Sequence, residues 1–208
     1  MKGFIVDSSY RIIHGKAFVS LFGRSEEGEA FLTLSDYRPY FFIKQSDLVQ
    51  AQHLEELDIE ETHLITFHGE PVVKVLVHIP SDVSALRKMF EPEGIQCYEA
   101  DIQFARRFLI DHKIQACMEV QGDYIYQGDM KVYTNPELTF LPLFSAPLKL
   151  LALDIETDSR ARTIYSISLV CGEYRNVLIV SEKKLKHAES FMTEKEMFRT
   201  IFCSYSRT

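Results

Sequence analysis

The sequence predicts an α+β fold in which short strands predominate and a few helices separate them. Short apolar or aromatic segments recur between turn residues, a pattern typical of β-structure. Two longer stretches, near 46–57 and 81–92, begin with residues that cap helices. An aperiodic stretch with two prolines, 141–147, predicts a linker and therefore two domains, residues 1–145 and 146–208.

The first domain is expected to form a mixed sheet. Its predicted strands cover residues 3–6, 16–22, 30–34, 40–43, 63–67, 72–77, 95–98, 117–120, 124–127 and 131–133. Besides the two helices already named, residues 101–111 predict a short helix in which Phe104, Phe108 and Ile110 suit burial. The second domain should begin with a strand in the apolar run that leads to Asp154. A hairpin over 164–171 and 176–180 and a helix starting near Thr193 should follow.

The composition limits the class of protein. A hydrophobic share of 46% and a charged share of 25% are ordinary for a soluble globular chain of 208 residues. A net charge of −7 argues against a protein that holds nucleic acid through its overall charge. The four cysteines lie far apart without a C-x-x-C pair, so the sequence signals neither a zinc site nor a disulfide framework. The apolar run at the start is too short for a signal peptide or a membrane span, so we expect a cytoplasmic protein without a membrane partner.

Asp154 and Glu156 are the candidate catalytic and metal-binding residues. They follow the apolar run 148–153, and alternation along a strand places both side chains on one face. Two neighbouring carboxylates repel each other unless a cation joins them, and Mg²⁺ or Mn²⁺ prefers such oxygen ligands. The alternative is a strand that ends in a polar turn with two solvated acids. We further expect three leucines of the run to be the most buried residues of this domain: Leu150, Leu151 and Leu153.

Three segments, in the same order along the chain, resemble family B DNA polymerases. Residues 98–111, which begin Tyr98-Glu99-Ala100-Asp101, are similar to the segment that precedes the exonuclease domain. Residues 151–157 resemble the first exonuclease motif, and residues 36–40 resemble a third landmark near the start. The Tyr-Glu-Ala-Asp form and the spacing to the acidic strand are most similar to the bacterial DNA polymerase II group.

The resemblance implies a ribonuclease-H-like 3′-5′ exonuclease domain, of which this chain would hold the first strands after the amino-terminal domain. The second and third exonuclease motifs and the polymerase-site acids have no counterpart, so it implies an amino-terminal fragment, inactive alone, of a DNA-directed DNA polymerase. In the full-length enzyme, Asp154 would ligate two Mg²⁺ or Mn²⁺ ions, and Glu156 would hold the ion that activates water. The implied partners are the DNA template and the primer 3′ end, in the bacterial nucleoid. A sliding clamp and a second copy, paired through the incomplete sheet, are further candidates.

The resemblance also implies a pocket for a template base, known in archaeal members. Small apolar walls would hold a flipped base and an arginine would lie near a phosphate. The matching residues are Pro39, Tyr40, Pro80, Val83, Phe104 and Arg107. Gln103 departs from a proline of the archaeal pattern, and these apolar residues could equally be ordinary core. The alternative function is a standalone, catalytically inactive nucleic-acid-binding or adaptor module with the same fold.

Overall fold

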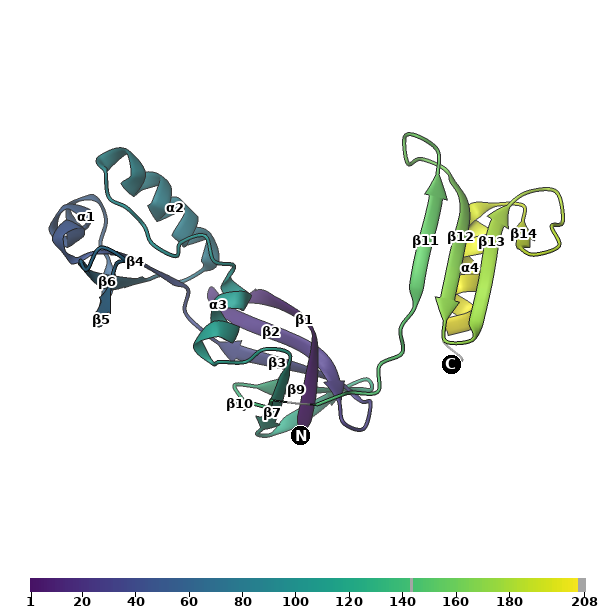
Figure 1. The fold of residues 1–208 in the computed structure, drawn as a ribbon, viewed down its shortest axis with the longest axis horizontal. Helices are drawn as coiled ribbons and strands as arrows, with labels where there is room; N and C mark the ends of the chain where they lie inside the picture. The colour runs from purple at the N-terminus through teal and green to yellow at the C-terminus, as the bar shows by residue number, and fades with distance from the viewer. Residues whose placement is uncertain (143, 206–208) are drawn as a thin grey trace. The chain divides into compact units, whose positions relative to one another are not determined.

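The computed structural model describes residues 1–142 and 144–205, with side chains through Ile201. The chain divides into two compact units, Met1–Pro147 and Leu148–Thr208. Each unit has its own sheet structure and its own core, as the ribbon shows (Figure 1). Among the described helices, none is long and apolar enough to cross a membrane.

A seven-stranded mixed sheet forms most of the first unit (Figure 1), in the order β10-β7-β1-β2-β3-β9-β8. Neighbouring strands run antiparallel except β3 and β9, which are parallel. The strands are β1 (Lys2–Ile13), β2 (Lys16–Ser25), β3 (Ala30–Asp36), β7 (Cys117–Gln121), β8 (Tyr124–Gln127), β9 (Met130–Thr134) and β10 (Glu137–Phe140).

Helix α3 (Phe104–Asp111) packs against β1 and β2 of this sheet. On β2, alternate residues point to the helix side, and Val19 and Leu21 are fully buried there. Phe104 and Phe108, one helical turn apart, fill the same core, as their spacing predicts. The burial expected for Ile110 is wrong: its side chain is 53% exposed, because it lies on the other side of the helix. The ring of Phe31 lies against Gly3 and Gly23, where the absence of a Cβ leaves room for it.

A second, three-stranded antiparallel sheet in the first unit has the order β4-β6-β5. Its elements are β4 (Tyr40–Lys44), a 3₁₀ turn (Gln45–Asp47), α1 (Leu48–Leu54), β5 (Asp58–Ile65), β6 (Pro71–Leu76), α2 (Pro80–Phe90) and a second 3₁₀ turn (Glu91–Glu93). Helix α2 begins with Pro80 in its first turn, and the Asp82 carboxylate accepts a hydrogen bond from the Ile79 N–H at 3.1 Å. Phe41, Val75 and Phe90 are buried between this sheet and its helices.

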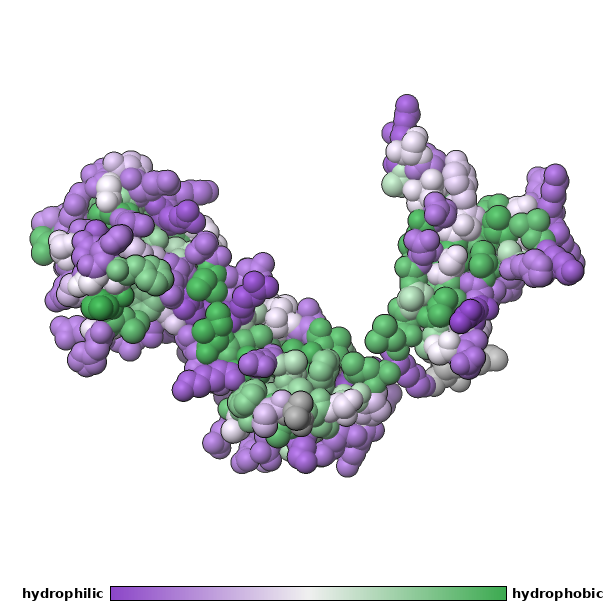
Figure 2. All heavy atoms as spheres, in the orientation of Figure 1, coloured by the Kyte–Doolittle hydropathy of each residue, from purple (hydrophilic) through white to green (hydrophobic). Residues whose placement is uncertain are grey.

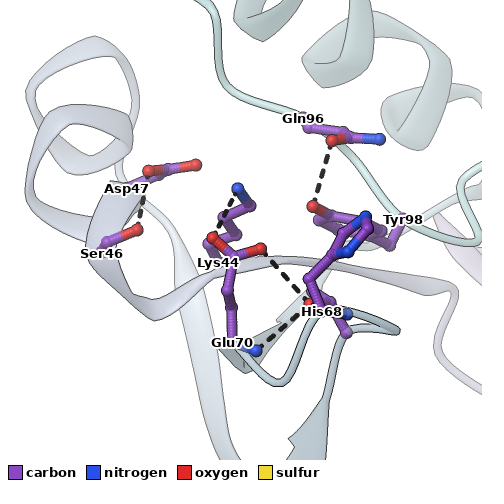
Figure 3. A network of polar contacts seen from close by, with 8 residues as sticks. Lys44, Ser46, Asp47, His68, Glu70, Gln96 and Tyr98 are labelled. Carbon is purple, nitrogen blue, oxygen red and sulfur yellow. Dashed lines mark hydrogen bonds and ion pairs between the residues drawn. The ribbon is translucent and has the colours of Figure 1, made fainter.

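Polar side chains fix the β5–β6 turn to strand β4 (Figure 3). The Thr66 hydroxyl oxygen accepts from the N–H groups of His68 and Glu70, each at 3.2 Å. The Lys44 ammonium donates to the Glu70 carboxylate at 2.9 Å. This hydrogen bond lowers the pKa of Glu70 and raises the pKa of Lys44.

The second unit contains a four-stranded sheet in the order β11-β12-β13-β14 and one helix (Figure 1). The pairs are antiparallel except β13 with β14, which is parallel. The elements are β11 (Ala152–Thr157), β12 (Ile164–Cys171), β13 (Tyr174–Val180), β14 (Glu189–Phe191) and α4 (Glu194–Tyr205). Helix α4 lies against β13 and β14, and Met197 completes a small core with Ile167, Leu169 and Leu178.

The predicted α+β fold class is confirmed, and the helices expected near 46–57 and 81–92 are α1 with its 3₁₀ turn and α2. The strand expected at 95–98 is reduced to a single bridge between Tyr98 and Phe42, and β10 and β14 were not predicted.

The burial expected for the leucines before Asp154 is wrong. Leu150, Leu151 and Leu153 are 74%, 39% and 48% exposed. The strand begins only at Ala152, β11 pairs with β12 alone among the described strands, and α4 covers β13 and β14 instead. An apolar run at the edge of a sheet therefore has no neighbour to bury it.

Candidate functional site

The acidic pair of the second unit lies on strand β11. Asp154 is opposite Ser168 and Glu156 is opposite Ser166 on β12, whereas Ile155 between them is opposite the buried Ile167. Both carboxylates therefore project from the sheet face opposite to the one that α4 covers. The alternation expected from the sequence holds in the structure, and both acids stand on an edge strand.

The oxygen ligands on β11 are of the type that a hard divalent cation prefers, but there are too few of them to enclose one. In the part of the chain that the structure describes, the carboxylates of Asp154 and Glu156 make no hydrogen bond and no ion pair, and both residues are exposed. Carboxylate and hydroxyl oxygens are ligands that Mg²⁺ and Mn²⁺ prefer. Within the described residues, however, no group of three or more His, Cys, Asp or Glu side chains could enclose a metal ion. Two carboxylates can hold an ion only weakly until further ligands join them.

A third acid, Asp158, shapes the loop that follows β11. Its Oδ1 accepts from the backbone N–H of Arg162 at 2.6 Å and of Thr163 at 2.9 Å. These hydrogen bonds lower the pKa of the Asp158 carboxyl. The sequence analysis did not single out Asp158, although an aspartate at the start of a short polar loop is a usual signal of such a turn.

The residues assigned to a template-base pocket converge in the first unit. All six line one cavity of about 530 Å³, a volume within the usual range of ligand pockets, roughly 300–1,000 Å³. They come from the start of β4, from α2 and from α3, and residues of β1 also contribute to the lining. Val83 and Phe104 also belong to the two hydrophobic cores of the unit, so the core interpretation of these residues holds alongside the pocket.

The Tyr40 ring is held on several sides. The Lys74 Nζ lies 4.4 Å and the Arg107 Cζ 4.9 Å from its ring centroid. Its hydroxyl donates to the Asp111 carboxylate at 2.6 Å, and Tyr37 donates to the same oxygen. Burial, together with the hydrogen bond to Asp111, raises the pKa of Tyr40 to about 12. Asp111, the last residue of α3, was missed by the sequence analysis, although it lies one helical turn beyond Arg107.

Arg107 is already paired within the protein. Its side chain is 8% exposed, one guanidinium nitrogen lies 2.6 Å from a Glu99 carboxylate oxygen, and another donates to the Glu99 carbonyl at 3.3 Å. Arg87 of α2 lines the same cavity, and its side chain makes neither a hydrogen bond nor an ion pair in the described part of the chain. Pro80, Val83, Ser84 and Arg87 recur at helical spacing, so one face of α2 lines the cavity. The cation available to a ligand is therefore Arg87 rather than Arg107.

Comparison with known proteins was made over the whole chain. No family model matches it. The chain is 27% identical over 176 residues to DNA polymerase II of Escherichia coli, a match that covers 82% of this chain and 22% of that protein. It is also 27% identical over 211 residues to a DNA polymerase of Archaeoglobus fulgidus, which covers 94% of this chain and 26% of the relative.

The structure gives a matching result. A family B DNA polymerase from Pyrobaculum calidifontis aligns with a TM-score of 0.72 and 22% identity, over 90% of this chain and 28% of the polymerase. The chain thus spans about a quarter of the length of these proteins. Over most of its length, the chain is similar to a bacterial and an archaeal DNA polymerase, and it has the fold of the amino-terminal region of a family B DNA polymerase.

Proposed function

We propose that this chain forms the amino-terminal region of a DNA-directed DNA polymerase with 3′-5′ proofreading exonuclease activity. The observation that carries the proposal is the exposed pair Asp154 and Glu156 on one face of β11, in a chain related to DNA polymerases over most of its length. The substrate is the DNA template with the primer 3′ end, and the working location is the bacterial nucleoid. A sliding clamp is a further partner of the full-length protein.

In the exonuclease reaction, Asp154 and Glu156 would hold Mg²⁺ or Mn²⁺ together with acids from outside this chain. The bound ions supply an activated water and stabilise the charge on the leaving 3′ oxygen. Asp154 would contribute a carboxylate to hold both ions, and Glu156 would contribute one to hold the ion that supplies the water. Because neither carboxylate is paired among the residues that the structure describes, no contact seen there has to break before they accept a ligand.

Loss of the acidic pair tests this role. In the full-length protein, Asp154→Ala should abolish nucleotide release from 3′-labelled single-stranded DNA while primer extension continues, because the two reactions use separate acids. Glu173→Ala, in the β12–β13 turn, is the matched control and should leave both reactions unchanged. The 208-residue chain alone should release no nucleotides with either ion. Undiminished release by the Asp154→Ala protein would show that the pair is only a solvated polar turn.

The cavity around Tyr40 supports a second role, the capture of a template base that is turned out of the strand. The buried Val83 and Phe104 supply apolar walls for a planar base, and Asp111 holds Tyr40 in place. Arg87, with the Ser84 hydroxyl beside it on α2, supplies the cation and donor for the adjoining phosphate.

Binding of short single-stranded DNA to the 208-residue chain tests the pocket. Val83→Gln should block the cavity and reduce binding of an oligonucleotide that contains one deaminated base among unmodified bases. Arg87→Ala should weaken binding and lower its salt dependence, because one phosphate contact is lost. Arg106→Ala on the exposed side of α3 removes the same charge outside the cavity and is the control. Equal losses with Arg87→Ala and Arg106→Ala would refute the assignment of Arg87.

A further inference from the structure

A separate cavity of about 430 Å³ lies in the first unit where the end of β3, the end of α3 and the start of β10 meet. It shares no lining residue with the cavity around Tyr40. The residues that determine its chemistry are Ser35, Asp36, Tyr37, Phe108, His112 and Glu137. We call it the His112 pocket.

Aromatic rings form one wall of the His112 pocket. The His112 ring packs against the Phe108 ring with centroids 4.0 Å apart and a 31° angle between the planes. Tyr37 meets both rings edge-on, at 5.2 Å from Phe108 and 6.0 Å from His112. Phe108 is buried, whereas His112 is exposed, so the flat surface available to a ligand is the His112 ring, with Tyr37 standing edge-on beside it. A planar group is the ligand shape that such a wall favours.

The pocket offers the Glu137 carboxylate as an unpaired acceptor, beside the Ser35 hydroxyl and the NH₂ group of Asn135, whose Oδ1 already accepts from the Asp36 N–H at 2.7 Å. Ser35 is 7% exposed, and its hydroxyl has no hydrogen-bond partner within the described structure. The exposed Glu137 carboxylate likewise has no partner in the described part of the chain. The His112 Nδ1 lies 2.9 Å from the Phe108 carbonyl oxygen, which can only accept, so Nδ1 carries the hydrogen. With Nδ1 as the donor, Nε2 is the ring nitrogen that is left to face a ligand.

The charge of the pocket is negative. Asp36 and Glu137 line it, and no described lysine or arginine does. The exposed Lys16 lies outside the lining, with its Nζ 4.0 Å from the Asp36 carboxylate. A third carboxylate, that of Asp111, lies behind the wall and accepts the hydrogen bond of Tyr37. Burial and this carboxylate raise the pKa of Tyr37, so its hydroxyl stays protonated. An anionic ligand is excluded, and a cation is favoured.

We propose that the His112 pocket binds the guanidinium group of an arginine side chain that a partner protein presents. Guanidinium is planar, carries only donors, and keeps its charge at every physiological pH. It can stack on the exposed His112 ring while two of its N–H groups meet the Glu137 carboxylate side by side. A lysine ammonium lacks the flat face, and a nucleobase lacks the charge and brings acceptors of its own. The inference is independent of the polymerase function.

Peptide titrations of the isotope-labelled 208-residue chain, followed by nuclear magnetic resonance, test the proposal. The probe is acetyl-Gly-Arg-Gly-amide, and its citrulline analogue has nearly the same shape without the charge. The arginine peptide should give saturable shifts at the backbone amides of Ser35, His112 and Glu137. The affinity of the citrulline peptide should be lower by about tenfold or more, which is the loss expected for one charged bidentate contact.

Variants identify the carboxylate. Glu137→Gln should weaken arginine binding about tenfold, because a neutral amide replaces the paired acceptor oxygens. Glu27→Gln, at an exposed turn outside the pocket, removes the same charge and should change nothing. Unchanged spectra elsewhere in Glu137→Gln show that it folds. Equal binding of citrulline, no effect of Glu137→Gln, or tighter binding of guanosine than of the arginine peptide would each overturn the proposal.

Discussion

The contact of Phe31 with two glycines allows a sharp test of the core of the first unit. A Cβ on Gly23 would lie well within 3.0 Å of both the Phe4 carbonyl oxygen and the Phe31 ring. A Cβ on Gly3 would meet only the Phe31 ring, at 2.7 Å. A ring in a packed core can shift at a cost, whereas the carbonyl of a paired strand cannot move without breaking the β1–β2 ladder.

Overpacking a core costs about 1–3 kcal/mol, so Gly3→Ala should lower the free energy of unfolding by about that amount. Gly23→Ala should cost about 3 kcal/mol or more, equivalent to a melting temperature roughly 6–12 °C lower for a chain of this length. Urea unfolding followed by circular dichroism measures both changes. Gly69→Ala, at φ +82 with no atom within 4 Å, is the control for backbone strain alone and should cost about 1–2 kcal/mol.

A double-mutant cycle separates the two causes. Phe31→Leu makes room beside both glycines, so it should offset much of the cost of Gly3→Ala and little of the cost of Gly23→Ala. A Gly23→Ala protein as stable as the Gly69→Ala control would refute the close approach of Phe4 and Phe31. Equal rescue of both alanines by Phe31→Leu would show that the Phe4 carbonyl is not the obstacle.

Three further tests address other parts of the structure. Thr33→Val should raise the stability by about 1 kcal/mol in urea, because the buried Thr33 hydroxyl has no partner within the described structure; a loss of stability would reveal a partner. Met197→Ala should destabilise the second unit by about 2–5 kcal/mol and Leu151→Ala by less than about 1 kcal/mol, as hydrogen exchange of β12 amides would show; the reverse order would refute the described core. The pKa of Asp158 is lower in the folded than in the unfolded chain, so its stabilisation is present above the unfolded value, near 3.9, and disappears as the pH falls through the folded value. Asp158→Ala should therefore unfold at lower urea than the parent at pH 7 and at the same urea at strongly acidic pH, and a constant difference across pH would contradict this role.

Local patterns in the sequence were sufficient for most elements of the fold. The spacing of α1 and α2 and the alternation along β2 depend on near neighbours in the chain, and these elements were predicted close to their observed bounds. The cap that the sequence suggested for α1 does not form, since neither the 3₁₀ turn nor α1 has a side-chain cap hydrogen bond in the described structure. Burial of Leu150, Leu151 and Leu153 was predicted wrongly because burial depends on what lies beside a strand, and β11 has β12 on one side alone among the described strands. Short strands such as β10, which follows a proline, carry too few residues for a period to show.

For the pocket around Tyr40, the sequence was sufficient to identify lining residues but not the contacts between them. Resemblance to a family was enough to select six residues that prove to line one cavity. It could not show that the Arg107 guanidinium already forms an ion pair with Glu99. That ion pair depends on Glu99, which has a positive φ of 57°, approaching the side of α3. It also could not show that Asp111 joins Tyr37 and Tyr40, which lie more than seventy residues away in the chain.

The position of Asp154 and Glu156 has a consequence for colloidal behaviour as well as for chemistry. Among the described strands, β11 pairs only with β12, so its outer edge presents unpaired backbone groups. Leu153 and Ile155 are exposed on the face opposite to that of the two acids. Hydrophobic surface is visible on the second unit in Figure 2. Such an edge is a template on which a second chain can add a strand, and proteins commonly guard it with charge. Here the two acids are that guard, since a copy docking in register would bring like charges together. A divalent cation that neutralised them would remove the repulsion, so the ion that we propose for this site would also expose the strand to aggregation until other strands cover it.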